Sequence, residues 1–171
     1  MSAPFLDQAI LKTLLHYAPE TGVFTWKRRT DVREQWNGRY AGKVAGYDWR
    51  VNDKLVYRSI RIFDWPFLGH RLAVLYVTGE WPPHEVDHED LDGLNNRWSN
   101  LRPATKPQNG ANRGANANSK TGVKGVRLLA CGKYDANFRN QRVGTAATVQ
   151  EASALYEAAA KAHFGKFARA S

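Results

Sequence analysis

The stretch that shapes the middle of this chain is VDHEDLDGLNNRWSNLRPATKPQNGANR, residues 86–113. Its pattern predicts a short strand that ends at His88, a polar loop, and a second extended segment that begins near Trp98. Thr105 and Gln108 have the spacing of a capping box, which marks the start of a helix. The stretch therefore predicts a strand, a loop, a strand and a helix in that order.

Four polar residues fall on these predicted elements. Asp87 and His88 end the first strand, Asn100 lies in the second, and Asn109 enters the first turns of the helix. A helix that folds back across a two-stranded ribbon can bring such residues together although they are distant in sequence. We therefore expect one site built from these four side chains.

The four side chains suit the hydrolysis of a phosphodiester bond. A histidine can take the proton of an attacking water at neutral pH, so His88 is the candidate base. Asp87 and Asn109 offer hard oxygen ligands, which suit one Mg²⁺ or Mn²⁺ ion better than zinc. Asn100 could accept a hydrogen bond from His88 and so fix its tautomer. Asp90, Asp92 and Gly93 suggest a calcium loop, but Ser99 stands where the bidentate Glu of an EF-hand belongs.

This stretch resembles the HNH nuclease motif, or ββα-metal fold, and especially the homing endonucleases of phages and introns, in which Asn replaces the last His. The resemblance implies that Asp87 and Asn109 bind the metal, that His88 is the general base, and that Asn100 orients it. The segments APETGVFTWKRR (residues 18–29) and GHRLAVLYVTGEWPP (residues 69–83) are also similar to this family. It implies an enzyme that cuts DNA.

The last fifty residues show a different pattern. Apolar and polar residues alternate over residues 134–139, with candidate strands on either side, and Thr148 and Glu151 form a second capping box. We expect three antiparallel strands backed by one helix. The stretch from SKTGVKGVRL to FGKFAR resembles the plant ethylene-response-factor DNA-binding domain. That resemblance gives as readers of the major groove Lys124, Arg127, Asn137, Arg139 and Arg142.

The positive charge of the chain is concentrated in this second part. The formal net charge is +9, and residues 1–100 contain as many acidic as basic side chains. All of the excess therefore lies in residues 101–171, which is typical of a protein that binds a polyanion. Arg102, Lys106 and Arg113 follow the nuclease-like motif closely, and we expect them to meet the DNA backbone; a solvated surface is the alternative.

These patterns predict an α+β protein with three parts. Residues 1–113 form an N-terminal α/β extension and a ββα-metal nuclease core. Residues 114–121, rich in Asn and Gly, form a linker, and residues 122–171 form the three-stranded sheet on one helix. His70 has two open interpretations, a contact to substrate phosphate or a buried histidine at a helix start.

The predicted function is a metal-dependent endonuclease that nicks double-stranded DNA or acts as a homing enzyme. The alternative is a DNA-binding regulator with an inert nuclease scaffold. The chain has one cysteine, no long apolar run and no secretory pattern at its start. We therefore expect a protein of a reducing cytosol without a membrane segment, and the lack of a long heptad pattern favours a monomer. The resemblance to phage nucleases implies a phage gene whose product acts in the cytoplasm of a bacterial host.

Overall fold

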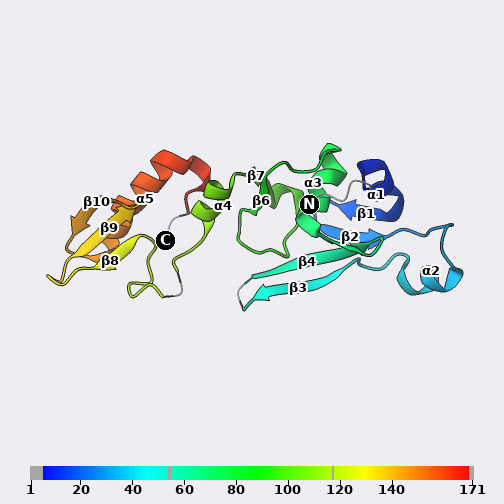
Figure 1. Ribbon diagram of the computed structural model, residues 1–171, viewed down its shortest axis with the longest axis horizontal. Helices are drawn as coiled ribbons and strands as arrows, with labels where there is room; N and C mark the ends of the chain where they lie inside the picture. Colours follow the sequence, from blue (N-terminus) through cyan, green and yellow to red (C-terminus); the bar gives the residue numbers. More distant parts are fainter. Residues whose placement is uncertain (1–5, 54, 117, 170–171) are drawn as a thin grey trace. The chain divides into compact units, whose positions relative to one another are not determined.

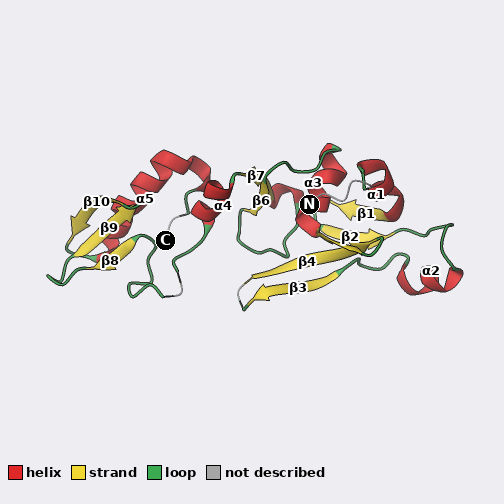
Figure 2. Cartoon of the chain, viewed as in Figure 1, coloured by secondary structure: helices red, strands yellow, loops and turns green. Residues whose placement is uncertain are grey.

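The computed structural model describes residues 6–53, 55–116 and 118–169. By its contacts the chain forms two compact units, Met1–Ala104 and Thr105–Ser171. Figure 1 follows the chain through both, and Figure 2 separates their helices and strands. The fold is mixed α+β, as predicted. Each unit is described by itself below.

The first unit begins with a short helix that runs into a hairpin. Helix α1 (Gln8–Leu14) is capped by the Asp7 side chain, which accepts a hydrogen bond from the Ile10 amide at 2.8 Å. Apolar residues recur at helical spacing from Leu6 to Leu15, but the helix ends at Leu14, and β1 (Leu15–Ala18) pairs antiparallel with β2 (Val23–Trp26). Spacing alone could not locate the helix end, because the buried strand is itself apolar.

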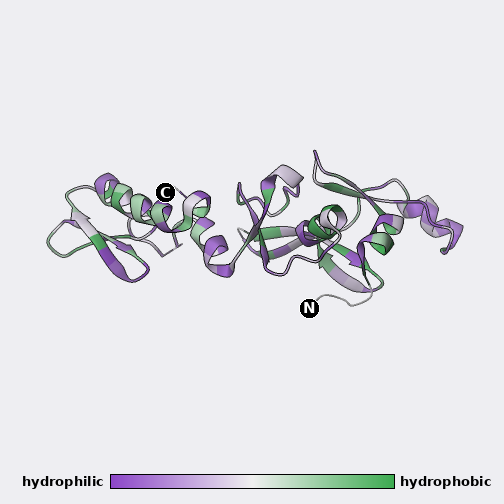
Figure 3. Cartoon of the chain, turned by 90° about the horizontal axis from the view of Figure 1, so that it is seen from above, coloured by the Kyte–Doolittle hydropathy of each residue, from purple (hydrophilic) through white to green (hydrophobic). Residues whose placement is uncertain are grey.

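A three-stranded sheet with order β3-β4-β5 follows, made of β3 (Tyr47–Asn52), β4 (Leu55–Ile62) and β5 (Trp65–Leu68). Helix α2 (Glu34–Tyr40) precedes it, in a region where the sequence showed no clear period. Figure 3 shows α2 as mostly hydrophilic, which explains why hydrophobic periodicity did not reveal it.

Helix α3 (Gly69–Thr78) supplies the centre of the core of this unit. Leu72, Ala73 and Leu75 are buried on it, and the helix ends at Gly79 in the left-handed conformation. The same core takes side chains from every earlier element except α2 and β3. Its other members include Leu11, Leu15, Tyr17, Phe24, Ala45, Ile60, Ile62 and Phe67.

The end of the unit contains the predicted ribbon. Strand β6 (Glu85–His88) pairs antiparallel with β7 (Leu101–Ala104), with Asp87 opposite Arg102 and His88 opposite Leu101. A 3-10 turn, η1 (Trp98–Asn100), precedes β7, so Asn100 lies just before the strand.

The second unit begins with α4 (Lys106–Asn112), whose predicted capping box between Thr105 and Gln108 is formed. Strands β8 (Val126–Leu128), β9 (Tyr134–Phe138) and β10 (Gln141–Ala146) form an antiparallel sheet with β9 in the centre. Helix α5 (Val149–Phe164) packs on this sheet and leads into a 3-10 turn, η2 (Gly165–Phe167). The prediction of three antiparallel strands and one helix is confirmed.

The contacts group α4 with the second unit, whereas the sequence analysis had placed it with the nuclease region. The helix packs against η2 and α5. The ammonium of Lys124 also donates hydrogen bonds to three carbonyls at the end of α4, those of Gly110, Ala111 and Arg113, at 2.7–3.1 Å. Within the described ranges, none of the helices is long and apolar enough to cross a membrane.

Candidate active site

Asp87 and His88 lie next to one another in β6, and both are almost completely buried. The exposed fraction is 2% for Asp87 and 6% for His88. The strand is positioned from the outside by Arg71 of α3, whose guanidinium donates hydrogen bonds to the Pro82 and His84 carbonyls. A buried carboxylate beside a buried imidazole is costly unless each has a polar partner, so their partners indicate what the pair does.

The partner of Asp87 is Arg102, which lies directly across the ribbon. Its Nε and Nη2 atoms each lie 2.8 Å from Oδ2 of the carboxylate. The Arg102 side chain is 9% exposed. The prediction that Arg102 meets the DNA backbone is therefore corrected: this guanidinium neutralises a buried carboxylate.

The partner of His88 is Asn96, and the prediction had named Asn100. The Nε2 atom of His88 lies 3.2 Å from Oδ1 of Asn96, which is itself 2% exposed. The side chain of Asn100 makes other contacts, donating to Oδ1 of Asp90 at 2.9 Å and to the Asn95 carbonyl at 2.8 Å. Asn100 thus fixes the loop over residues 89–97 rather than the ring of His88.

The tautomer of His88 follows from the second contact of Asn96. Its Nδ2 atom donates to the Leu94 carbonyl at 3.3 Å, so Oδ1 faces the imidazole and accepts from Nε2–H. The lone pair of His88 is then on Nδ1. Burial lowers the pKa of His88, although the bond to Asn96 and the charges of Asp90, Asp87 and Asp92 act in the opposite direction. The ring is therefore neutral at pH 7 and able to accept a proton.

The loop between the strands is held by its own side chains. Asp90 accepts hydrogen bonds from Asn95 and Asn100 and from the Asp92 amide. Burial acts to raise the pKa of Asp90, but these hydrogen bonds outweigh it, and the pKa lies below its usual value. Gly93 packs so closely on β4 that an added Cβ would lie 2.3 Å from the Val56 carbonyl oxygen. The loop therefore has a fixed shape beside His88.

Two rings enclose His88 on its other sides. The ring of His70, the second residue of α3, lies 5.0 Å from that of His88 in an edge-to-face arrangement. Tyr57 of β4 lies 5.2 Å from His70 and 6.0 Å from His88. Burial, aided by the nearby His88 and Arg71, lowers the pKa of His70 to about 3. Of the two interpretations of His70, the structure supports the buried histidine, and it places that histidine against the candidate base.

The N-terminal hairpin braces Asn96. The hydroxyl of Tyr17 donates to the Asn96 carbonyl at 2.7 Å, and the Arg97 guanidinium donates to the Glu20 carbonyl at 3.0 Å. Gly22 approaches so closely that an added Cβ would lie 2.3 Å from the Asn96 carbonyl carbon. From the sequence, Asn96 was expected only to shape the loop together with Asn95 and Arg97. No signal in the sequence distinguishes it from Asn95 and Asn100, because only the hairpin contacts select it.

The donor set around β6 is suited to a hard cation, although it is small. Asp87 is a buried carboxylate, and residues 80–92 carry six acidic side chains and no Lys or Arg. Among the described residues, no three or more His, Cys, Asp or Glu side chains lie together so that they could hold a metal ion. Asn109 lies on α4 in the second unit. Mg²⁺ accepts one or two protein oxygens and completes its shell with water and phosphate, so this donor chemistry fits it.

In the second unit a buried carboxylate organises three of the predicted DNA-binding residues. Asp135 of β9 has no exposed surface. Its carboxylate contacts Arg127 of β8 at 2.8 Å and Arg142 of β10 at 2.7 Å, and it accepts a hydrogen bond from Asn137 at 2.8 Å. The bond from Asn137 is the largest cause of a lowered pKa of Asp135, and the two guanidinium groups lower it further. Arg127 and Arg142 remain 64% and 59% exposed.

Two other predicted readers lie elsewhere. Lys124 binds the carbonyls at the end of α4, so its ammonium is part of a helix cap, and the base contact that the resemblance gives for it stays a prediction. Arg139 lies in the turn between β9 and β10 with φ of 50°, and its Nη1 is 2.8 Å from Nε2 of His163 on α5. The alternation had placed Arg139 on the open sheet face, which is wrong because the strand ends at Phe138. Lys106 and Arg113 are exposed at the two ends of α4.

Comparison with known proteins agrees with this geometry. Residues 68–111 match the family model described as HNH endonuclease. A protein of Acanthamoeba polyphaga mimivirus, described as an uncharacterized HNH endonuclease, is 35% identical over 105 residues, which cover 58% of this chain and 54% of that protein. This chain thus spans about half the length of that relative. No solved structure matches the chain. Residues 68–111, which include Asp87, His88 and Asn109, are therefore similar to HNH endonucleases.

Proposed function

We propose that this protein is a metal-dependent DNA endonuclease that hydrolyses phosphodiester bonds with His88 as its general base. The observation that carries the proposal is the pair Asp87–His88, a buried carboxylate and a buried neutral imidazole on one strand. This strand lies inside the segment matched by the HNH endonuclease family. A neutral histidine in a fixed orientation is the group that activation of a water molecule requires at neutral pH.

The proton of the attacking water passes to Nδ1 of His88. The opposite nitrogen donates its hydrogen to Asn96, which holds the ring in one tautomer and stabilises the imidazolium that forms. We therefore assign the orienting role to Asn96, in place of Asn100. Asn100 acts one step further away, through the loop that carries Asn96.

We assign one Mg²⁺ or Mn²⁺ ion to Asp87 and Asn109, where the role of Asn109 rests on its position in the HNH-like motif. When bound, such an ion stabilises the charge that develops on the phosphate and on the leaving oxygen. Asp87 supplies a carboxylate oxygen, and the acidic residues of the loop add a negative potential that attracts a cation. Arg102 holds the carboxylate in place from the opposite strand.

The second unit supplies the contact to double-stranded DNA in this proposal. Arg127, Asn137 and Arg142 lie around Asp135 on one sheet face, and both guanidinium groups are exposed. The resemblance of this unit to the plant ethylene-response-factor domain supports the same face as the reader of the major groove. One chain carries one site, so a monomer would nick one strand. The proposal also includes a homing activity and a phage gene whose product acts in a bacterial cytoplasm. Both rest on the resemblance to the homing endonucleases alone.

Nicking of supercoiled plasmid by the full chain with Mg²⁺ or Mn²⁺ tests the proposal. We expect His88→Ala to lower the rate by about 10²–10⁴-fold, the usual contribution of a general base, and to leave duplex binding intact. His84→Ala, at an exposed histidine four residues away, is the matched control and should nick like the wild type. Equal nicking by His88→Ala and the wild type would remove His88 from the mechanism.

One observation favours the second candidate, a DNA-binding regulator with an inert nuclease scaffold. The carboxylate of Asp87 is already neutralised by Arg102, so the ribbon does not need a metal for stability. Under this alternative the purified chain binds duplex DNA but nicks no substrate with either ion. The same plasmid assay therefore separates the two candidates.

A further inference from the structure

The first hundred residues carry no net charge, but their charges are segregated. Residues 26–64 contain ten Lys or Arg and five Asp or Glu, whereas residues 80–92 contain six acidic side chains and no Lys or Arg. The basic segment contains α2 and the strands β3 and β4. This unit therefore has a cationic segment of its own, separate in sequence from the acidic loop beside His88.

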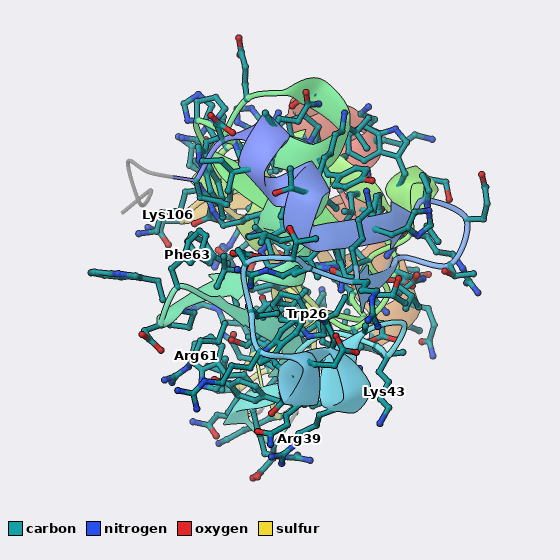
Figure 4. The ribbon with its side chains drawn as sticks, turned by 90° about the vertical axis from the view of Figure 1, so that its right-hand side faces the viewer. Trp26, Arg39, Lys43, Arg61, Phe63 and Lys106 are labelled. Carbon is teal, nitrogen blue, oxygen red and sulfur yellow. The ribbon has the colours of Figure 1, made fainter. Side chains whose placement is uncertain are left out.

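The basic segment lines an open cavity of about 650 Å³. This volume is within the range of about 300–1,000 Å³ that is typical of small-ligand sites. Its wall is aromatic and cationic. The residues come from β2 and the loop after it, from α2, from the start of β3, and from the end of β4 with the turn that follows. The side chains that matter here are Trp26, Arg29, Trp36, Tyr40, Arg61 and Phe63, and Figure 4 labels three of them, Trp26, Arg61 and Phe63.

The two arginines of the wall differ in their partners. Arg29 is paired with Asp31, and its guanidinium lies 5.4 Å from the ring centroid of Trp36, so it holds the wall together. Arg61 is exposed, and among the described residues its guanidinium has no hydrogen bond or ion pair. Two further cations lie close by: Arg39 lies 5.3 Å from the ring centroid of Tyr40, and the carbonyl of Lys43 accepts a hydrogen bond from the Trp26 amide. Arg61 is therefore available to an anion.

Phe63 occupies a position that backbone energetics do not favour for an aromatic residue. It and Asp64 form the two-residue turn between β4 and β5, with φ of 48° and 67°. Such turns favour Asn and Gly, because both central residues are left-handed. The Phe63 side chain is nevertheless 49% exposed, at the edge of the cavity. A strained and exposed aromatic beside a cavity points to a ligand rather than to the stability of the turn.

We propose that this cavity binds an unpaired nucleotide of a nucleic acid strand. The aromatic wall stacks the base, and Arg61 contacts the phosphate. Duplex DNA cannot occupy the site in this way, because the faces of its bases are covered by their neighbours. The occupant is therefore single-stranded DNA or a base that has left the stack, in addition to the duplex read by the second unit.

Binding of a short, fluorescently labelled single-stranded DNA oligonucleotide by the full chain, compared with a duplex of the same sequence, tests this proposal. Phe63→Asn removes the ring and places a residue suited to the turn, and Arg61→Gln removes the free cation. Two controls match them. Phe63→Tyr keeps the ring under the same strain, and Arg50→Gln removes an exposed arginine of β3 that does not line the cavity.

We expect Phe63→Asn and Arg61→Gln each to weaken single-strand binding by about tenfold, on the order of one stacked base, while duplex binding stays near that of the wild type. Phe63→Tyr and Arg50→Gln should bind both probes like the wild type. Thermal unfolding of Phe63→Asn at or above the wild-type temperature excludes misfolding as the cause.

The proposal fails if the wild type does not bind the single strand, if Phe63→Asn binds it unchanged, or if both probes lose affinity equally. Nicking is not measured, so a failure of the proposed nuclease activity remains a separate result.

Discussion

The two units contain the same cross-strand pair, an aspartate and an arginine opposite one another on adjacent antiparallel strands. Asp87 faces Arg102 in the first unit, and Asp135 faces Arg127 in the second. Both carboxylates are buried, but the Arg102 side chain is 9% exposed and the Arg127 side chain 64%. The two arginines therefore differ in role, as their exposure shows. Arg102 neutralises the buried charge of Asp87, whereas Asp135 orients the guanidinium of Arg127, which is open to solvent.

The largest effect is expected when the buried pair is broken. Arg102→Met leaves Asp87 as an uncompensated buried charge, which should lower the free energy of unfolding by about 3–5 kcal/mol. Mg²⁺ should restore more stability to this variant than to the wild type, because a bound cation replaces the lost guanidinium. Thermal unfolding with and without Mg²⁺ measures both effects. An equal response to Mg²⁺ in the two proteins would contradict a metal at Asp87.

A second prediction concerns pH and the ring beside His88. His70 has a folded pKa of about 3, lowered by burial, against about 6.5 in the unfolded chain. As the pH falls below about 6.5, the unfolded state takes up a proton that the folded state does not, so the free energy of unfolding decreases by up to about 1.4 kcal/mol per pH unit. Urea unfolding at several pH values should show a shallower dependence for His70→Phe. His16→Gln, at an exposed histidine, should keep the wild-type slope.

The exposed arginines of the second unit should affect binding more than stability, because each single substitution leaves Asp135 with Asn137 and one guanidinium. Arg127→Gln or Arg142→Gln is expected to weaken duplex binding by about tenfold, since a guanidinium contact to a base contributes about 1–3 kcal/mol. If the contact is to phosphate, the affinity falls for all sequences and the salt slope decreases by about one. Titrations at several salt concentrations distinguish these cases. Unchanged affinity in both variants would show that this sheet face does not meet DNA.

The smallest effect is expected at Lys124. Because its ammonium caps α4, Lys124→Met should lower the free energy of unfolding by about 1 kcal/mol, the usual contribution of a helix cap or hydrogen bond. The salt slope of duplex binding should stay as in the wild type. A decrease of that slope by about one would restore Lys124 to the DNA contact that the sequence suggested.

The sequence alone predicted those helices and strands whose pattern lies within a few neighbouring residues. The capping boxes at Thr105 and Thr148 and the alternation in β9 correctly predicted two helices and a strand. The sequence did not predict the partner of His88, because contacts between residues far apart in the chain determine it. Asn96 is selected by the hairpin through Tyr17 and Gly22, and no periodicity reports such a contact.

Three basic residues that were expected to contact DNA have partners within the protein. Arg102 was expected at the DNA backbone because it follows the nuclease-like motif, and Lys124 and Arg139 in the major groove because of the resemblance to the plant domain. The structure pairs them with Asp87, with the α4 carbonyls and with His163. A cationic side chain near a buried acceptor binds that acceptor first, and only the fold reveals where the acceptor lies.

The central claim is that the HNH-like segment around His88 cuts and the sheet of β8, β9 and β10 reads the sequence. Mapping nick positions across a randomised duplex library tests it most directly. The wild type, His88→Ala, and the single variants Arg127→Gln and Arg142→Gln are compared with Mg²⁺. We predict nicks at preferred sequences for the wild type and almost none for His88→Ala. For each arginine variant we predict nicks with a flattened sequence preference. Nicks by His88→Ala at the wild-type positions, or an unchanged preference in both arginine variants, would contradict the claim.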